Sequence, residues 1–241
     1  KPVIQEEQLG TGHAVLTLLN SNEFKNDDSE YIVIIPGDAP LLLKESIDTL
    51  ISESTNRKVA LGIITAEVTN PSGYGRIIKD GNTISKIVEE ADSSEDEQKI
   101  NEINSGMYCF NKNFLLENIK TLNSNNEQNE IYLTDLIEIA FQNKLDTVIV
   151  QVSEDTIKGV NSMSQLNEVE TSLREELITS HMENGVYFQD PTSTYIDKGV
   201  VIKAGSRIMA NTHLTGTTEI HDNCVVGPNT MINDSIIGEG S

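Results

Sequence analysis

The carboxyl-terminal part of the chain repeats with a strict period of six residues, and this period restricts the fold more than any other feature. Aliphatic residues share one phase of the repeat, at Ile196, Ile202, Ile208, Leu214, Ile220, Val226 and Ile232. Small residues follow four places after the middle five of them, at Ser206, Thr212, Thr218, Cys224 and Thr230. This pattern predicts a parallel β-helix, whose coils have three faces and corners that admit only small side chains. A β-meander would show a period of two instead.

The segment before the repeat has helical spacing. Leu166, Val169, Leu173 and Leu177 lie on one face, and glutamates occupy the others. Such glutamates are more typical of a solvated face than of a metal cluster. We therefore predict a first domain over residues 1–160, a linker helix over 161–187 and β-helix coils over 188–241. A slip of phase at Ile236-Ile237 predicts an adjusted corner.

The first 160 residues alternate between short apolar runs and helical patterns. Apolar runs typical of strands occupy residues 31–35, 58–68, 107–110 and 147–152. Apolar residues at helical spacing mark residues 14–19, 43–51 and 135–141. Asp80-Gly81 predicts a hairpin between two further strands. This alternation predicts an α/β domain with a mainly parallel sheet.

A glycine-rich turn precedes the first helical pattern. Gly10 and Gly12 permit positive φ and the close approach of a flat ligand to the backbone. Thr11 between them is a candidate cap for the helix, whose free N–H groups would face the same ligand. Gln5 and Gln8 carry amides that donate and accept, as reading a nucleobase edge requires. The alternative is a tight strand-to-helix turn that binds nothing.

Polar residues also follow the predicted strands. Asp38 comes just after the run at residues 31–35, where open α/β sheets bind ligands, and its carboxylate suits a divalent cation. The alternative is a turn aspartate that accepts backbone N–H bonds. Glu89 ends the hairpin, and Asn104 precedes the next strand. This clustering at strand ends favours one shared site.

Charge and cysteine content restrict the possible partners of the protein and its cellular compartment. The chain carries 17 basic against 38 acidic residues, a net charge of −21, which disfavours nucleic acid as a partner. Any phosphate site must therefore depend on local donors, a metal or residues outside this sequence. Cys109 and Cys224 lack metal-ligand spacing and predict buried free thiols in a reducing, cytoplasmic compartment. No apolar run is long enough to cross a membrane, and no signal peptide is visible.

Seven segments together resemble a known family. They are Gln5-x-x-Gln8-Leu9-Gly10-Thr11-Gly12-His13-Ala14, Gly37-Asp38-x-Pro40-Leu41, Asn70-Pro71-x-Gly73-Tyr74-Gly75-Arg76-Ile77, Ile87-Val88-Glu89, Glu102-Ile103-Asn104-x-Gly106, Tyr132-Leu133-Thr134-Asp135 and Gly159-Val160-Asn161. In this wording and order the chain resembles the bacterial N-acetylglucosamine-1-phosphate uridylyltransferases, bifunctional enzymes that also acetylate glucosamine-1-phosphate. The resemblance implies a Rossmann-like nucleotidyltransferase domain followed by the start of a left-handed parallel β-helix.

The resemblance also implies roles for single residues. Gln5, Gln8, Gly10 and Thr11 would hold the uridine. Gly73, Glu89 and Asn104 would contact N-acetylglucosamine. Asp38 and Asn161 would bind Mg²⁺, and Asn161 also belongs to the substrate site. Asp38 and a neutral amide form a sparse oxygen set that suits Mg²⁺, which takes its other ligands from phosphates and water.

The implied reaction is uridylyl transfer. The phosphate of N-acetylglucosamine-1-phosphate attacks the α-phosphorus of UTP, UDP-N-acetylglucosamine forms and pyrophosphate leaves in line. Because the nucleophile is already an anion near neutral pH, positioning and charge neutralisation carry catalysis, and no general base is needed. We therefore assign His13 a structural role. In the full-length family the β-helix forms a homotrimer and binds acetyl-coenzyme A.

The chain also departs from the family pattern. The family's Gly-x-Gly-Thr-Arg-Met loop, which would cradle the triphosphate, is not in this sequence. Ala91 stands where the family usually has lysine, and Asn129-Glu130-Ile131 replaces Gly-Glu-Tyr. We therefore expect an internal piece of a longer protein that is inactive alone. The alternatives are another sugar-1-phosphate nucleotidyltransferase with a β-helix tail, such as a glucose-1-phosphate enzyme, or a non-catalytic assembly subunit of the same fold.

Overall fold

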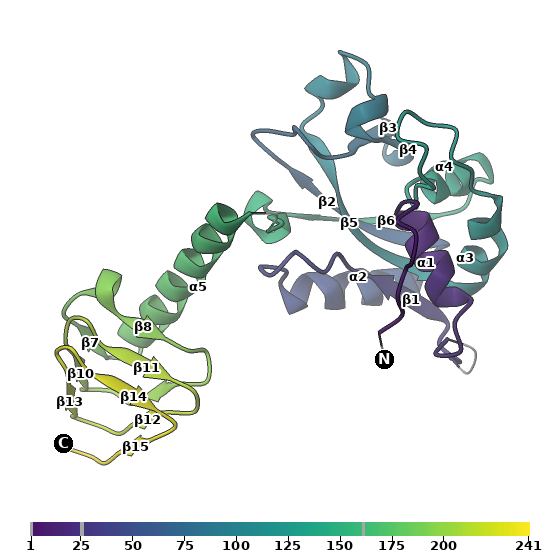
Figure 1. Ribbon diagram of the computed structural model, residues 1–241. Helices are drawn as coiled ribbons and strands as arrows, with labels where there is room; N and C mark the ends of the chain where they lie inside the picture. Colours follow the sequence, from purple (N-terminus) through teal and green to yellow (C-terminus); the bar gives the residue numbers. More distant parts are fainter. Residues whose placement is uncertain (1, 25–26, 161) are drawn as a thin grey trace. The chain divides into compact units, whose positions relative to one another are not determined.

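The computed structural model describes residues 2–24, 27–160 and 162–241 (Figure 1). The chain divides into two compact units, residues 1–159 and residues 160–241. The second unit includes the long helix that precedes the repeat, because this helix packs on the first coil.

Helices and strands alternate through the first unit, as the sequence predicts. The helices are α1 (Thr11–Leu19), α2 (Lys44–Arg57), α3 (Lys112–Asn118) and α4 (Asp135–Gln142), with short 3-10 turns at Glu90–Asp92, Glu97–Lys99, Ile119–Thr121 and Glu154–Ile157. The strands are β1 (Tyr31–Ile34), β2 (Leu61–Glu67), β3 (Arg76–Asp80), β4 (Thr83–Val88), β5 (Glu102–Asn111) and β6 (Thr147–Val152).

The strands form one mixed sheet. Its order in the described residues is β4-β3-β5-β2-β6, and β1 pairs with the remaining length of β5. β1, β2 and β3 each run antiparallel to β5, while β6 runs parallel to β2. Most strands therefore share one direction, as expected for this α/β fold. Among the described strands of this unit only β2 and β6 pair in parallel, because β5 runs the opposite way through the middle of the sheet.

Both faces of the sheet are covered, which explains its continuous apolar strands. Alternate residues point to opposite faces. On one face Ile63 and Phe110 pack with α1, α3 and α4. On the other face Ile64 and Cys109 pack with Leu50 of α2. The unit therefore has three layers, with α2 the one described helix on its side of the sheet (Figure 1).

Strand β5 contains a bulge opposite β2. Ile63 pairs with Tyr108, whereas Thr65 pairs with Asn104, so β5 holds extra residues between these pairs. Gly106 takes φ +76° inside the bulge, and a Cβ there would lie 3.1 Å from the Pro36 ring. The Ser105 hydroxyl donates to the Ile64 carbonyl at 2.7 Å and stabilises the bulge. Bulges of this kind redirect side chains beside functional sites.

The second unit begins with helix α5 (Met163–Glu183) and continues as the predicted parallel β-helix (Figure 1). Its strands are β7 (Tyr187–Phe188), β8 (Tyr195–Ile196), β9 (Val201–Ile202), β10 (Arg207–Ile208), β11 (His213–Thr215), β12 (Glu219–Ile220), β13 (Val225–Val226), β14 (Met231–Asn233) and β15 (Ile236–Ile237). Within residues 162–241 they form three parallel sheets, β7-β10-β13, β8-β11-β14 and β9-β12-β15.

The aliphatic positions stack in register through these sheets. Ile196, Leu214 and Ile232 align on one face, and the first two are almost fully buried. On the third sheet Ile220 aligns with Ile237, whereas a strict period of six would align it with Gly238. The last coil is therefore one residue shorter, as the slip of phase predicts.

The small residues fill the corners of the coils. Ser206, Thr212, Thr218 and Cys224 are all fully buried. The Thr218 hydroxyl donates to the Thr215 carbonyl at 2.7 Å, so this corner satisfies its own polar groups. Cys224 and Cys109 are buried free cysteines, as predicted. In the part of the chain that the structure describes, no helix has the length and apolar character needed to span a bilayer.

Candidate functional site

A cavity of about 390 Å³ lies beside the β5 bulge in the first unit. It collects four of the residues that the sequence predicts for one site: Thr11, Gly73, Glu89 and Asn104. Its apolar wall includes Ile34, Ile35 and Pro36, where the chain leaves β1, together with Tyr108 and Leu133. Because β5 runs antiparallel to β1, the first residues of β5 lie at the carboxyl end of β1. The opposite directions of β1 and β5 thus place Asn104 near the carboxyl end of β1, beside the cavity.

The glycine turn fits tightly against the segment before α4. The Gly12 N–H donates to the Ile131 carbonyl at 2.8 Å, and the Ile131 N–H donates to the Leu9 carbonyl at 2.8 Å. Gly10 takes φ +102°, and a Cβ there would lie 2.7 Å from the Ile131 oxygen. Glycine is therefore required by the packing of the turn itself, and Gly10 is the residue before the first turn of α1.

Thr11 does not cap α1 as the sequence suggests. The N-cap position is Gly10, which has no side chain to do so. The Thr11 hydroxyl instead accepts a hydrogen bond from the Leu133 N–H at 3.0 Å. A contact between distant segments therefore replaces the local cap, and it fixes Thr11 at the edge of the cavity.

The two glutamines differ in their surroundings. The Gln5 Nε2 lies 2.8 Å from His13 Nδ1 and donates to the Gly10 carbonyl at 3.3 Å. His13 thus has a partner at the start of α1, which suits the structural role assigned to it. Gln8 is exposed, and its amide has no hydrogen bond within the described residues. Neither glutamine lines the cavity.

The amide of Asn104 is held in one orientation. Its Oδ1 accepts from the Gly106 N–H at 2.9 Å and from the Tyr108 hydroxyl at 2.9 Å. Because the oxygen is occupied on the protein side, the Nδ2 group remains as the donor, and it has no partner among the described residues. Tyr108 is buried, and this burial raises the pKa of its hydroxyl, which stays a donor. Asn104 therefore offers N–H groups to a bound molecule.

Glu89 offers the complementary acceptor. Its Oε1 accepts from the Thr134 hydroxyl at 3.0 Å, and Gly75 lies so close that a Cβ there would be 3.1 Å from Oε2. Burial raises the pKa of Glu89, and the negative charges of Asp135 and Asp92 raise it further, against the lowering effect of Thr134. Donor and acceptor thus face one cavity, the combination that a polyhydroxy ligand requires.

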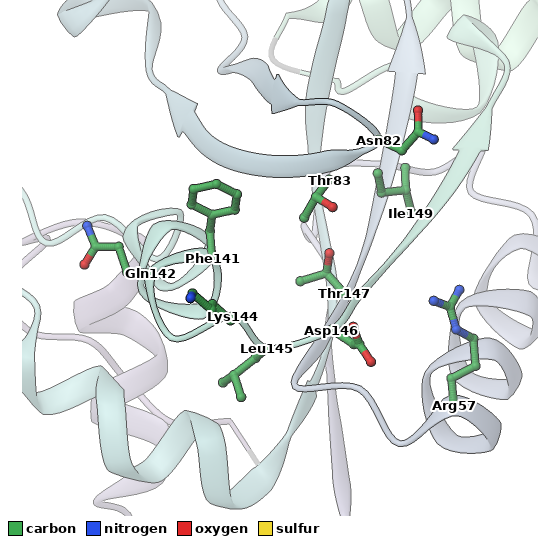
Figure 2. Close-up of a pocket in the computed structure, with 10 residues that line it drawn as sticks. All are labelled: Arg57, Asn82, Thr83, Phe141, Gln142, Lys144, Leu145, Asp146, Thr147 and Ile149. Carbon is green, nitrogen blue, oxygen red and sulfur yellow. The ribbon is translucent and has the colours of Figure 1, made fainter.

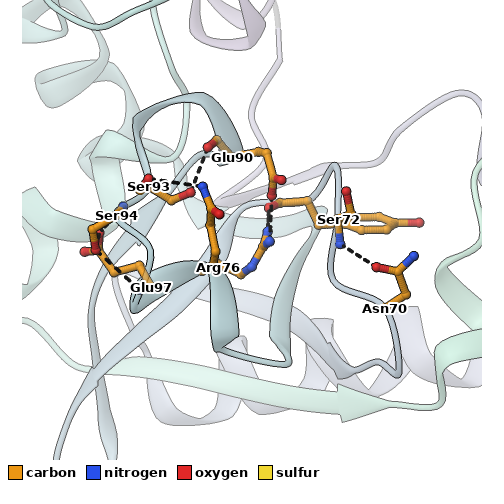
Figure 3. Close-up of polar contacts among 9 residues, drawn as sticks. Asn70, Ser72, Arg76, Glu90, Ser93, Ser94 and Glu97 are labelled. Carbon is orange, nitrogen blue, oxygen red and sulfur yellow. Dashed lines mark hydrogen bonds and ion pairs between the residues drawn. The ribbon is translucent and has the colours of Figure 1, made fainter.

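Gly73 belongs to a loop that precedes β3. It takes φ +86°, and no atom lies within 4 Å of the position that a Cβ would occupy. The Asn70 Oδ1 accepts from the Ser72 N–H at 3.2 Å and closes the start of the loop (Figure 3). Gly73 therefore lines the cavity with backbone that no neighbouring atom crowds.

The proposed metal ligands are only partly described. Asp38 is exposed, follows β1, and forms no hydrogen bond or ion pair with any described residue. Its carboxylate accepts no backbone N–H bond from a described residue, and its role as a Mg²⁺ ligand stays a prediction. Asn161 lies outside the described residues. No group of three or more His, Cys, Asp or Glu residues with metal-binding geometry occurs in the described ranges.

Comparison with known proteins identifies the first unit. A family model described as "Nucleotidyl transferase" matches residues 1–156. The chain belongs to the nucleotidyl transferase family. A second model, "Bacterial transferase hexapeptide (six repeats)", matches residues 199–234 and so covers most of the β-helix of this nucleotidyl transferase.

Relatives of this nucleotidyl transferase confirm the resemblance found in the motifs. "Bifunctional protein GlmU" from Clostridium novyi (strain NT) is 45% identical over 238 residues, covering 98% of the chain and 52% of the relative. The protein of the same name from Clostridium botulinum (strain ATCC 19397 / Type A) is 44% identical over 240 residues, covering 98% of the chain and 51% of the relative. The chain therefore spans about half the length of these relatives.

A solved structure supports the fold of this nucleotidyl transferase. The crystal structure of UDP-glucose pyrophosphorylase complexed with UDP-glucose superposes with a TM-score of 0.53 at 18% identity. The match covers 71% of this chain and 64% of the other. At this identity the likeness concerns the fold alone.

The nucleotidyl transferase unit has a second cavity, of about 730 Å³, at the opposite end of the sheet. Figure 2 shows Thr147 and Ile149 at the start of β6, with Phe141 from α4, Arg57 from α2 and the hairpin residues Asn82 and Thr83 around them. Because β1 and β6 run the same way, the start of β6 is the end farthest from Pro36. None of the described residues that the sequence predicts for the site lines this cavity.

Sequence reasoning overlooked the residues that orient the site in this nucleotidyl transferase. Thr134 holds Glu89, Tyr108 holds Asn104, and Ser105 holds the bulge. Thr134 belongs to the motif Tyr132-Leu133-Thr134-Asp135, but the motif gave it no role. Asn104 lies within β5 and not before the strand as predicted, and the small, turn-prone triplet Asn104-Ser105-Gly106 is the signal that indicates the bulge.

Proposed function

We propose that the protein containing this chain transfers uridylate from UTP to N-acetylglucosamine-1-phosphate, giving UDP-N-acetylglucosamine and pyrophosphate. The observation that carries the proposal is the convergence of Thr11, Gly73, Glu89 and Asn104 on one cavity. These residues come from four separate motifs, and the family resemblance gives all four to the same substrates. The names of the relatives add support.

The chain's own residues contribute binding and orientation. The Asn104 Nδ2 donates to the sugar, and Glu89 accepts from sugar hydroxyls beside the bare backbone of Gly73. Thr11 and Gly10 lie under the uridine, with Gln5 and Gln8 at the base edge. Holding both substrates in line lowers the entropic part of the barrier. Mg²⁺, held by Asp38 and Asn161, would neutralise phosphate charge, so EDTA should weaken phosphate-dependent binding.

For the whole protein that contains this chain we also propose a second activity, an oligomeric state and a location. The name "Bifunctional protein GlmU" and the hexapeptide match support a second, acetyl-coenzyme A-dependent activity on glucosamine-1-phosphate. We also propose a homotrimer through the β-helix and a cytoplasmic location. These proposals depend on the family resemblance and concern parts of the relatives that this chain does not cover.

Thermal-shift measurements on the purified chain test the substrate. UDP-N-acetylglucosamine should raise the Tm more than UDP-glucose or ADP-glucose at equal concentration. Asn104→Ala should remove the advantage of the acetamido sugar. Asn167→Ala, an exposed asparagine on α5, is the matched control and should keep it. A larger shift with UDP-glucose or ADP-glucose would contradict the proposal and favour a glucose-1-phosphate enzyme. No shift with any nucleotide sugar, even in a chain that carries the family's Gly-x-Gly-Thr-Arg-Met loop ahead of Lys1, would favour the non-catalytic subunit.

A further inference from the structure

Arg76 is the largest fully buried side chain of the described residues, in a chain with only four arginines. Its side chain is 2% exposed, and its Nη2 lies 2.6 Å from Glu90 Oε2. Its Nη1 donates to the Tyr74 carbonyl. Figure 3 shows the guanidinium between Glu90 and the loop that carries Ser72. Arg76 does not line the cavity, so a direct contact with substrate does not explain it.

The guanidinium joins two walls of the cavity. Tyr74 lies in the loop from Gly73 to Gly75, which forms one wall, and Glu90 follows Glu89, which forms another. Arg76 itself pairs with Val88 across the β3–β4 hairpin, so both walls leave the sheet at the same place. Beyond that point no strand pairing between described residues holds them together. The ion pair therefore closes the open end of the hairpin.

The pair also decides which of two adjacent glutamates faces the cavity. Glu89 has an extended backbone, with φ −65° and ψ 152°, and Glu90 begins a 3-10 turn, so the two side chains project in different directions. Anchoring Glu90 to the buried Arg76 turns Glu89 toward Thr134 and the cavity. The Ser93 hydroxyl donates to the Glu90 carbonyl at 2.7 Å and fixes the turn that follows (Figure 3).

We infer that Arg76 and Glu90 are positioning residues for the sugar part of the site, because their ion pair sets the orientation of Glu89 and its spacing from the Gly73 loop. The inference rests on the proposed function for the identity of the ligand. It assigns no role to the pair in uridine binding, because the glycine turn is held instead by the hydrogen bonds of Thr11 to Leu133 and of Gly12 to Ile131.

Calorimetric titration of the full chain with UDP-N-acetylglucosamine and with UMP tests the inference. Arg76→Met should lower the affinity for UDP-N-acetylglucosamine about 10- to 100-fold, since a small displacement of a binding group has effects of this size. UMP affinity should stay within about twofold, because UMP lacks the N-acetylglucosamine group. Hydrogen exchange should rise at residues 73–75 and 89–92. Lys86→Met is the matched control, because Lys86 of the same hairpin pairs with Glu97 at 3.3 Å, and it should change neither affinity.

A double variant separates positioning from stability. Removing Glu90, whose side chain is 39% exposed, would leave the buried Arg76 charge unpaired, which can unfold a protein, whereas removing both charges is often tolerated. Arg76→Met combined with Glu90→Leu should therefore fold with near wild-type Tm yet keep the weakened sugar affinity. Wild-type sugar affinity in the double variant, or in Arg76→Met, would overturn the inference. Failure of the wild-type chain to bind UDP-N-acetylglucosamine would instead overturn the proposed function, and these results are distinct.

Discussion

Glu89 is a carboxylate in a place that disfavours its charge. Burial and the nearby charges of Asp135 and Asp92 raise its pKa, and among the described residues only Thr134 donates to it. A structure selected for stability alone would place a neutral residue here. Functional sites often retain such groups, because an acceptor that water does not satisfy binds a ligand more strongly.

The variant Glu89→Gln should be more stable than the wild type at pH 7. A carboxyl group whose folded pKa is raised binds its proton more tightly in the folded state, so stability falls as pH rises from the unfolded pKa toward the folded one. The variant's Tm advantage should thus be largest at neutral pH and vanish below about pH 4, near the unfolded glutamate pKa. Thermal unfolding from pH 3.5 to 7.5 measures this.

Glu53→Gln, at an exposed position of α2, serves as control and should show little change at any pH. An equal Tm advantage of Glu89→Gln at pH 4 and pH 7 would refute the assigned cause. The same variant should bind UDP-N-acetylglucosamine about 10- to 100-fold more weakly, since a hydrogen bond to a charged group contributes about 1.5–3 kcal/mol.

Gly10→Ala should destabilise the first unit by about 1–3 kcal/mol, the usual cost of a strained backbone. The φ of +102° and the 2.7 Å approach of a Cβ to the Ile131 oxygen both oppose a side chain. Urea unfolding measures the change. Gly37→Ala is the matched control, because no atom lies within 4 Å of its Cβ position, and it should stay within about 0.5 kcal/mol. Equal effects of both substitutions would contradict the argument.

At the scale of elements, the β-helix derives its stability from stacked aliphatic residues. Each coil is too short to bury its own apolar face, so coils stabilise one another through aligned positions. Leu214 illustrates this, because it is fully buried between Ile196 and Ile232 on adjacent coils. The outward residue of the same sheet, Met231, is 74% exposed.

Leu214→Ala should therefore lower the free energy of unfolding of the second unit by about 2–5 kcal/mol, because it removes buried methyl groups and leaves a cavity. Met231→Ala, its exposed control, should stay within about 0.5 kcal/mol. Hydrogen exchange at residues 207–226 follows the second unit by itself. If exchange there is the same in both variants, the stacked ladder does not carry the stability of the coils.

At the scale of the whole molecule, the net charge of −21 is the dominant electrostatic fact. Repulsion among like charges destabilises a compact chain, and salt screens it over about 10 Å at 0.1 M. Several described ion pairs are exposed on both sides, such as Lys99–Asp96, and such pairs contribute little to stability.

The Tm of the chain should therefore rise when NaCl is increased from 20 to 300 mM at pH 7. At pH 5, where part of the acidic charge is neutralised, the rise should be smaller. Scanning calorimetry at both pH values checks the pair of results. A Tm that falls with salt would mean that attractive pairs outweigh the net repulsion.

The local and periodic features of this protein can be predicted from its residues alone. The six-residue repeat predicts the coils and the buried corners from Ser206 to Cys224, because one residue per repeat must point inward at each corner. The alternation of strands and helices predicts the α/β unit, and the hairpin at Asp80-Gly81 follows from turn chemistry alone. Four of the residues that the motifs propose for the site line the cavity, Thr11, Gly73, Glu89 and Asn104, whereas Gln5, Gln8, Gly10 and Asp38 do not.

How those residues are held depends on contacts between distant segments, which form only in the folded chain. Thr11 lies beside α1 in sequence, yet its hydroxyl bonds to Leu133, and Asn104 is oriented by Tyr108 across a bulge. The reversed direction of β5 could not be predicted from the sequence either, because apolar strands covered on both faces have the same residue pattern in either direction. Such contacts join segments far apart in the chain, and local propensity carries no information about which distant group will satisfy a given donor.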